Sequence, residues 1–116
     1  MRYLLLVVLT ACADVRAATL SDGRPFTPPV VYARWYHDVE VCSGIHRDAY
    51  ERITWYAVPG EQFTTGYEAY AVGYWDDHRI YLAESHLTDS NTVKHEILHE
   101  LNGPGHPSVF DRCRLR

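Results

Sequence analysis

Residues 88–103 of the 116-residue chain, TDSNTVKHEILHELNG, predict an amphipathic helix close to its C-terminal end. Asp89 or Ser90 can cap the start of this helix, and Gly103 followed by a proline must end it. Apolar residues recur at intervals of four on one side: Val93, Ile97 and Leu101. We therefore expect this side of the helix to be buried against a sheet, which leaves another side free to face a cleft.

Metal-binding residue types occupy that other side. His95 and His99 are four residues apart, so their imidazoles lie on one face of a helix and can reach the same ion. Glu96, next to the first histidine, can lean toward a metal-bound water without binding the metal itself. The spacing predicts a Zn²⁺ site with Glu96 as its general base.

The third metal ligand is less well determined by the sequence. His106 follows His99 beyond a Gly-Pro-Gly turn that lets the chain double back, and three imidazoles with one open position form a catalytic zinc arrangement. Asp111 is an alternative third ligand, and a site without a third protein ligand is another. Glu100 points about 100° around the helix from His99, so it is better suited to support a ligand than to bind the ion. We favour His106.

The residues HEILHELNGPGH resemble the zincin metallopeptidases, and most of all the metzincin motif His-Glu-x-x-His-x-x-Gly-x-x-His. Two residues of the match, Gly103 and His106, fall one position later than in that motif. The single methionine is Met1, so the chain has no Met-turn. The resemblance, which covers only the C-terminal part of the chain, therefore points to a minimal zincin-like domain.

That resemblance implies ligand roles for His95, His99 and His106 and a general-base role for Glu96. It also implies that residues 79–83 form the edge strand that pairs with an extended substrate.

The mechanism that follows is hydrolysis. Zinc on three histidines lowers the pKa of its bound water toward about 7, and Glu96 would take the proton and pass it to the leaving amine. Candidate donors to the oxyanion are Tyr74, Tyr81 and His86. We expect an exported zinc metallohydrolase, a peptidase that acts on a peptide or protein. The alternative is a non-catalytic zinc-stabilised, or metal-free, envelope lipoprotein that serves as a binding or structural module.

A first helix is predicted within residues 28–44, PPVVYARWYHDVEVCSG. Prolines are tolerated in a first turn, and Gly44 can stop the helix. Its apolar residues recur at spacings of four, four and three, which predicts a buried stripe ending at a cysteine: Val31, Trp35, Val39 and Cys42.

Three strand-like segments lie between the two helices: residues 52–60, 67–75 and 79–83. Asp76, Asp77 and His78 make a tight hairpin plausible between the last two. The order of helix, three strands and helix predicts a small α+β domain over residues 28–116, with an antiparallel or mixed sheet.

The N-terminal sequence MRYLLLVVLTAC resembles a secretory signal, because a charged start precedes an apolar run too short to span a bilayer. Residues 9–12, Leu-Thr-Ala-Cys, resemble a bacterial lipobox, in which Cys12 is lipidated and becomes the first mature residue. An ordinary signal cleaved after Ala17 or Ala18 is the alternative. With Cys12 lipidated, residues 13–27 would be a flexible tether from the membrane to the domain. We expect a membrane-anchored lipoprotein of the bacterial cell envelope, facing the periplasm or the exterior.

Cysteine usage and charge are consistent with that location. If Cys12 carries lipid, Cys42 and Cys113 remain, and an exported domain tends to pair them as a disulfide; two unpaired buried thiols are the alternative. The formal net charge of −4 argues against a nucleic-acid partner, which would need a basic face.

Overall fold

The computed structural model describes residues 17–116. The predicted signal and lipobox, with Cys12, lie outside the described residues, as does the start of the predicted tether. Within residues 17–116, no helix combines the length and the apolar character that crossing a membrane requires.

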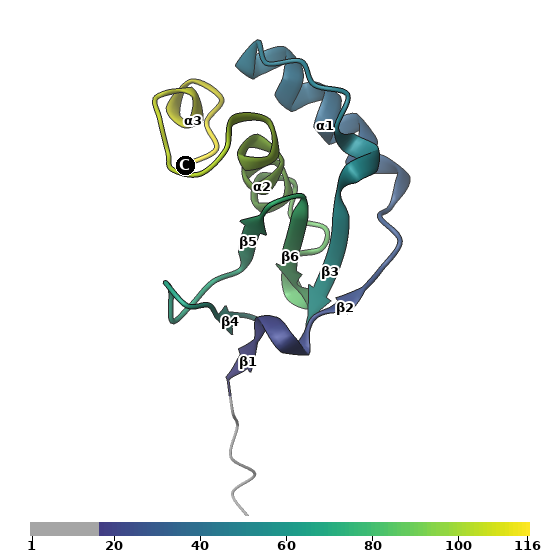
Figure 1. The fold of residues 1–116 in the computed structure, drawn as a ribbon, viewed down its shortest axis with the longest axis vertical. Coiled ribbons are helices and arrows are strands. Elements are labelled where there is room, and N and C mark those ends of the chain that lie inside the picture. The colour runs from purple at the N-terminus through teal and green to yellow at the C-terminus, as the bar shows by residue number, and fades with distance from the viewer. Residues whose placement is uncertain (1–16) are drawn as a thin grey trace, which may run out of the picture.

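The domain is built on a four-stranded mixed sheet in the order β2-β3-β6-β5 (Figure 1). β3 and β6 are parallel, while β2 and β5 are antiparallel to their neighbours. Two further short strands, β1 and β4, pair in parallel as a separate sheet. The bounds of the strands are β1 Ala18–Thr19, β2 Arg24–Pro25, β3 Thr54–Val58, β4 Phe63–Thr64, β5 Gly73–Asp76 and β6 Arg79–Ala83. The α+β class is confirmed, with a mixed sheet one strand larger than predicted.

The extra strand comes from residues that the sequence placed in a flexible tether. From Ala18 on, the segment is ordered into β1, a 3₁₀ turn (η1, Leu20–Asp22) and β2. The prediction of a tether is wrong for residues 18–27, because the backbone of this polar stretch pairs with β4 and β3 although it has no apolar period of its own. Gly23 permits the close approach: a Cβ there would lie 3.2 Å from the Tyr81 ring.

The hairpin between β5 and β6 is confirmed. Asp76 pairs with Arg79, so the loop has only two residues, Asp77 and His78, with φ angles of +42° and +68°. Positive φ at both positions is the geometry of a two-residue type I′ turn. Asp77 tolerates it without the Asn-Gly sequence that usually marks such a turn.

α1 (Val30–Ser43) ends at Gly44 as predicted, but its buried face differs from the predicted stripe. The buried residues are Tyr32, Tyr36, Val39 and Ser43, so only Val39 is shared with the prediction, and Cys42 is exposed at the edge. Tyrosine can occupy such a face when its hydroxyl finds an acceptor. Tyr36 donates to the carbonyl of Arg47 at 2.7 Å, and Tyr32 donates to that of Leu87.

α2 (Ser90–Asn102) follows β6 after a short 3₁₀ turn (η3, Glu84–His86) and packs beside α1 over the sheet (Figure 1). Asp89 is its N-cap and accepts hydrogen bonds from the backbone of Asn91 and Thr92. The predicted apolar face is confirmed, since Val93, Ile97 and Leu101 are fully buried. Together with α1 and the inner face of the sheet these residues form the main core.

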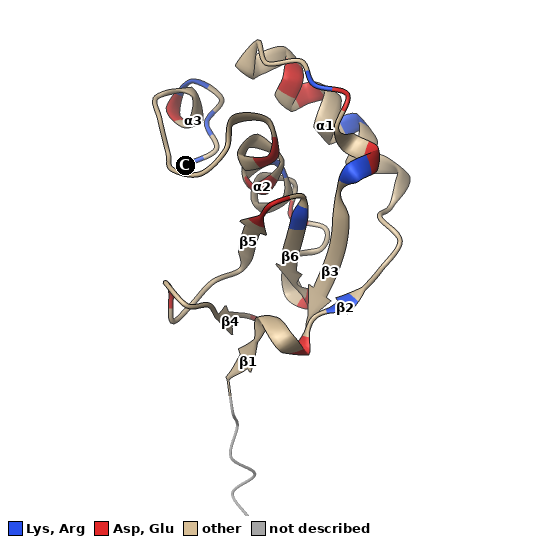
Figure 2. Ribbon diagram, viewed as in Figure 1, with Lys and Arg blue, Asp and Glu red and all other residues tan. Residues whose placement is uncertain are grey.

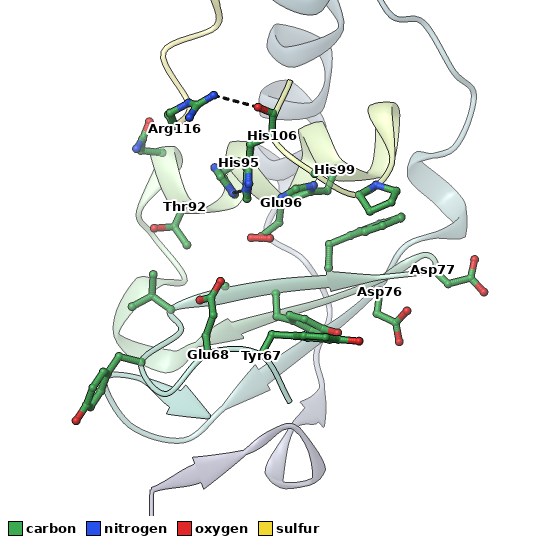
Figure 3. A pocket seen from close by; sticks show the side chains of 18 residues that line it. Tyr67, Glu68, Asp76, Asp77, Thr92, His95, Glu96, His99, His106 and Arg116 are labelled. Carbon is green, nitrogen blue, oxygen red and sulfur yellow. Dashed lines mark hydrogen bonds between the residues drawn. The ribbon is translucent and has the colours of Figure 1, made fainter. Parts of the chain in front are cut away.

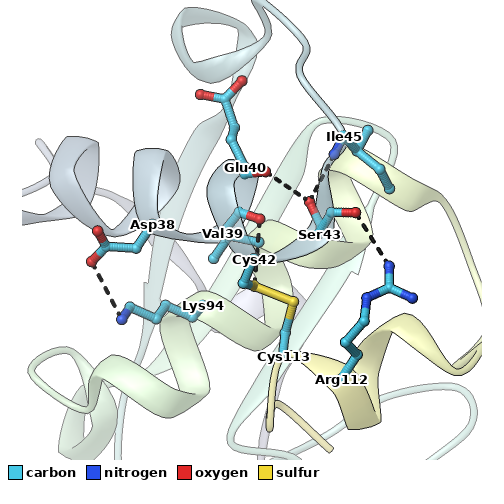
Figure 4. Close-up of a disulfide and its surroundings, with 9 residues drawn as sticks. All are labelled: Asp38, Val39, Glu40, Cys42, Ser43, Ile45, Lys94, Arg112 and Cys113. Atoms are coloured by element: carbon cyan, nitrogen blue, oxygen red, sulfur yellow. Dashed lines mark hydrogen bonds and ion pairs between the residues drawn. A yellow bond between two sulfur atoms is a disulfide. The ribbon is translucent and has the colours of Figure 1, made fainter.

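The C-terminal segment is fastened to α1. α3 (Val109–Arg112) is followed by Cys113, which forms the predicted disulfide with Cys42 across a sequence separation of 71 residues (Figure 4). Arg112 also donates to the carbonyl of Ser43 at 3.3 Å. These contacts fix the path of the last residues of the chain, which return toward α2.

Candidate metal centre

Three histidines converge at the C-terminal half of α2. His95 and His99 lie on one face of the helix, and His106 joins them from the segment beyond it, so one nitrogen of each lies within 4.8 Å of the others. Nε2 of His95 and Nε2 of His106 are 3.2 Å apart. A tetrahedral zinc ion with Zn–N bonds of about 2.05 Å separates its ligand nitrogens by about 3.3 Å. The three histidines are therefore placed so that they could hold a metal ion.

The turn after α2 makes this convergence possible. Gly103 and Gly105 have φ angles of +93° and +85°, which side-chain-bearing residues rarely adopt, and Pro104 lies between them. The turn reverses the chain and brings His106 back over the helix. Arg116 stabilises this position of His106 by donating a hydrogen bond to its carbonyl at 3.0 Å.

Backbone carbonyls orient two of the imidazoles. Nδ1 of His99 donates to the carbonyl of Gly103 at 3.0 Å, and Nδ1 of His95 donates to that of Leu115. A carbonyl only accepts, so each Nδ1 carries the proton and each Nε2 keeps its lone pair. Such hydrogen bonds fix the ring and the tautomer of metal-binding histidines.

Phe110 forms the apolar floor of the site. Its ring centroid lies 5.0 Å from that of His95, 4.8 Å from that of His99 and 5.0 Å from that of His106. The ring is completely buried. An apolar floor keeps water away from one side of the imidazoles and lowers the local dielectric.

Burial also keeps His95 and His99 neutral. It lowers the pKa of His99, which is only 8% exposed, to about 4, although the hydrogen bond to Gly103 opposes the shift. It lowers the pKa of His95 as well, against the hydrogen bond with Leu115. Neutral imidazoles are the form that binds metals, so both are ready as ligands at neutral pH.

Glu96 is buried next to the triad without a partner. Its side chain is 4% exposed, and within residues 17–116 its carboxylate makes no hydrogen bond or ion pair. Burial, with a smaller contribution from the nearby charge of Glu68, raises the pKa of Glu96 to about 8. Space for the carboxylate comes from Gly73 in β5, where a Cβ would lie only 2.9 Å from Oε2 of Glu96.

Glu100, one turn further along α2, is buried but fully partnered. Nε1 of Trp75 donates to its Oε2 at 2.6 Å, and Nδ1 of His78 donates to its Oε1. Trp75 in turn lies nearly parallel to His99, with ring centroids 6.0 Å apart. Glu100 thus ties the β5–β6 hairpin to the helix, a role that the sequence did not indicate for His78.

The triad and Glu96 open into a cavity of about 860 Å³ between α2 and β5 (Figure 3). β5 is the edge strand of the sheet beside this cavity, and β6 lies inside the sheet between β3 and β5. The expectation that residues 79–83 form the edge strand is therefore wrong. The β5–β6 hairpin places β5 on the outer side of β6, so β5 forms the exposed edge of the sheet.

The remaining candidates are separated by the fold. Tyr74 lines the cavity, whereas Tyr81 stacks on Tyr56 with centroids 4.6 Å apart and His86 bonds to Ser85 at 2.8 Å. Asp111 pairs with Arg116 at 2.8 Å and is not part of the triad. The sequence did not indicate Phe110 or the carbonyl of Leu115, since nothing in their residue types marks them as parts of a site.

Comparison with known proteins gives no further guide to the site. The chain matched no protein-family model, no curated protein and no solved structure. What is shown is a small α+β domain with a disulfide and a histidine triad that could hold a metal ion.

Proposed function

We propose that this chain is a zinc-dependent metallohydrolase of zincin-like type that cleaves peptide or protein substrates. The observation that carries the proposal is the placement of Glu96: a buried carboxylate with no partner in the described part of the chain faces a cavity beside three convergent histidines. Its oxygens have no protein partner among residues 17–116 and stay accessible from the cavity, a placement that suits a chemical role more than a structural one.

The donor set favours zinc. Imidazole nitrogens suit Zn²⁺, whereas an all-oxygen set would suit Mg²⁺ or Ca²⁺. Three protein ligands with access to a cavity match a catalytic zinc site better than a structural one, which normally has four. When bound, zinc would act as a Lewis acid on the substrate and lower the pKa of a bound water.

The protein's own contribution to hydrolysis would come from Glu96. A cation beside it favours its ionised form and so lowers the pKa that burial raises. The carboxylate then accepts a proton from the attacking water, and the resulting acid donates it to the leaving amine. Tyr74, which lines the same cavity, is our candidate for the hydrogen bond to the oxyanion.

A second candidate function is a metal-stabilised binding or structural module. The observation that favours it is that one ion would cross-link α2 to the segment carrying His106 in a small domain. Glu96 distinguishes the two functions, because a structural site has no use for an unpartnered base.

The test combines metal content and turnover in the purified, zinc-supplied protein. Elemental analysis should find about one zinc per chain in the wild type and a reduced zinc content, or none, in His106→Ala. The zinc content of His46→Ala should be unchanged, because His46 is an exposed histidine outside the triad. Glu96→Ala should keep its zinc and lose hydrolysis of a quenched-fluorescence peptide mixture. Folded wild-type protein without zinc would refute both functions, and full hydrolysis by Glu96→Ala would refute the role of that residue.

We also propose that the protein is exported and anchored to the bacterial cell envelope through a lipid on Cys12. The disulfide supports an oxidising location. Metabolic labelling with a palmitate analogue should mark the wild type and not Cys12→Ala, and equal labelling or none in both would contradict the anchor.

A further inference from the structure

The wall of the cavity opposite α2 is a loop formed by residues 65–72. Its turn is closed by Thr65, whose hydroxyl accepts from the backbone of Tyr67 at 3.1 Å and of Glu68 at 2.9 Å. Below the turn, the bridge between Phe63 and Ala71 fastens the loop to the buried cluster under the sheet. The turn thus places its side chains at the mouth of the cavity (Figure 3).

Those side chains combine aromatic rings with a free carboxylate. Tyr67 and Tyr70 are 86% and 76% exposed, although both line the cavity. Glu68 lies between them in the sequence and has no ion-pair partner in the described part of the chain. Aromatic faces beside a carboxylate are the groups that bind an organic cation, through cation–π and charge attraction together.

The charge balance of the cavity points in the same direction. Asp76 and Asp77 also line it, and Figure 2 shows acidic residues both in the loop after β4 and at the end of β5. Asp76 pairs with Arg79 at 3.2 Å. Among residues 17–116, Arg116 is the one Lys or Arg that lines the cavity, and it is already bonded to Asp111 and to the carbonyl of His106. In the described part of the chain, therefore, no Lys or Arg of the lining pairs with Glu68.

A second and independent observation is the position of Glu96 on the α2 side of the cavity. Glu96 is 4% exposed and unpartnered within residues 17–116, and its carboxylate points into the space that Glu68 faces from the other side (Figure 3). Two carboxyl groups thus face one cavity, and no Lys or Arg of residues 17–116 pairs with either of them. A ligand that brings positive charge would be attracted by Glu68, and its cation would also favour the ionised form of Glu96.

We infer that the substrate carries a Lys or Arg side chain next to the bond to be cleaved, and that Glu68, with Tyr67 and Tyr70, binds it. This inference rests on the proposed peptidase function. One exposed ion pair contributes about two- to fivefold in affinity, and an exposed cation–π contact a similar factor. We therefore expect a preference of about five- to tenfold for a cationic side chain, which added salt weakens.

The test uses the full chain loaded with zinc and three dye-labelled hexapeptides that differ only by Lys, Gln or Glu at one central position. Binding is measured by fluorescence anisotropy on the isosteric Glu96→Gln variant, which prevents turnover. The Lys peptide should bind about five- to tenfold more tightly than the Gln peptide, and the Glu peptide most weakly. Glu68→Gln should reduce the preference by about two- to fivefold and leave only the share that the aromatic rings contribute.

Glu51→Gln is the matched control, because it removes the same charge from an exposed residue outside the cavity. Equal binding of the Lys and Gln peptides, no measurable binding of the Lys peptide, or an unchanged preference in Glu68→Gln would overturn the inference. Wild-type cleavage of the same peptides separates the two claims. Cleavage of all three at equal rates would leave the peptidase and refute the subsite. A Glu68-dependent preference in binding without any cleavage would leave the subsite and refute the peptidase.

Discussion

Gly73→Ala is expected to displace Glu96, the general base that we propose, without disturbing either the fold or the histidine triad. A Cβ at this position would lie 2.9 Å from Oε2, 3.0 Å from Cγ and 3.1 Å from Cδ of Glu96. Ordinary contacts of a Cβ begin near 3.4 Å. The carboxylate must therefore retreat by about half an ångström or more, and the end of a glutamate side chain is free to do so.

The magnitude follows from the sensitivity of catalysis to position. A displacement of about 1 Å at reacting groups costs about 10²-fold in rate, which corresponds to about 2.7 kcal/mol in the activation barrier. We expect Gly73→Ala to lower kcat/KM by about 10- to 100-fold. Stability should change little, because Gly73 does not have a positive φ and alanine is favoured over glycine inside a strand by about 0.5–1 kcal/mol.

Three measurements on the same preparation check this expectation: cleavage of the quenched-fluorescence peptide mixture, zinc content and urea unfolding. Thr54→Ala in β3 is the control, since it also places an alanine in a strand of the sheet, at an exposed position outside the cavity. Full activity of Gly73→Ala would refute the reasoning. A fall in zinc content or in unfolding free energy large enough to explain the lost activity would also refute it. Gly73 would then support the fold and not the position of Glu96.

Three further predictions concern the supports of the site. Asp89→Ala should cost about 1 kcal/mol of unfolding free energy at pH 7. Hydrogen bonding to Thr92 lowers the pKa of Asp89 in the folded state. This stabilisation is therefore present above the unfolded pKa near 3.8 and is lost as the pH falls through the lower pKa of the folded state. An undiminished difference between wild type and variant in urea unfolding at pH 2 would contradict it. Cys42→Ser together with Cys113→Ser should lower the unfolding free energy by about 4 kcal/mol, because the disulfide closes a loop of 71 residues. The double variant should also weaken the proposed zinc binding, because it releases the segment whose Leu115 carbonyl orients His95. Unchanged zinc affinity in still-folded protein would show that the disulfide does not support the site. Glu100→Ala should lower the unfolding free energy by about 2–4 kcal/mol, since Trp75 and His78 lose their acceptor. Glu84→Ala, at an exposed position, should change it by no more than about 0.5 kcal/mol. Equal effects of the two variants in thermal unfolding would refute the anchoring role of Glu100.

The parts of the structure that could be predicted from the sequence depend on local signals. The bounds of α2 follow from an N-cap, a regular apolar period and a glycine stop, all within sixteen residues of quoted sequence. His95 and His99 follow from helical geometry alone. The β5–β6 hairpin follows from its polar loop. In each case the interaction that decides the structure lies within a few residues of the pattern that predicts it.

The parts that could not be predicted depend on distant segments. The order β2-β3-β6-β5 is set by which strands pair, and residues 18–27 have no apolar period that would indicate β1 or β2. The buried face of α1 depends on acceptors for Tyr32 and Tyr36 that lie 55 and 11 residues away. Phe110 reaches the histidines only because the Cys42–Cys113 disulfide and the turn after α2 bring the C-terminal segment back.

The different roles that we assign to two identical residues show how one strand can decide a site. Glu96 and Glu100 are one turn apart on α2, both buried, separated by about 6 Å of helix rise. Alternate residues of a strand are about 6.7 Å apart on one face, so Gly73 and Trp75 of β5 come opposite the two glutamates in turn. Trp75 supplies a donor and fixes Glu100, while Gly73 supplies no side chain and leaves Glu96 open to the cavity, without a partner among the residues that the structure describes. An exchange of a glycine for a larger residue, or of the tryptophan for one without a donor, would therefore change which carboxylate is held and which is free.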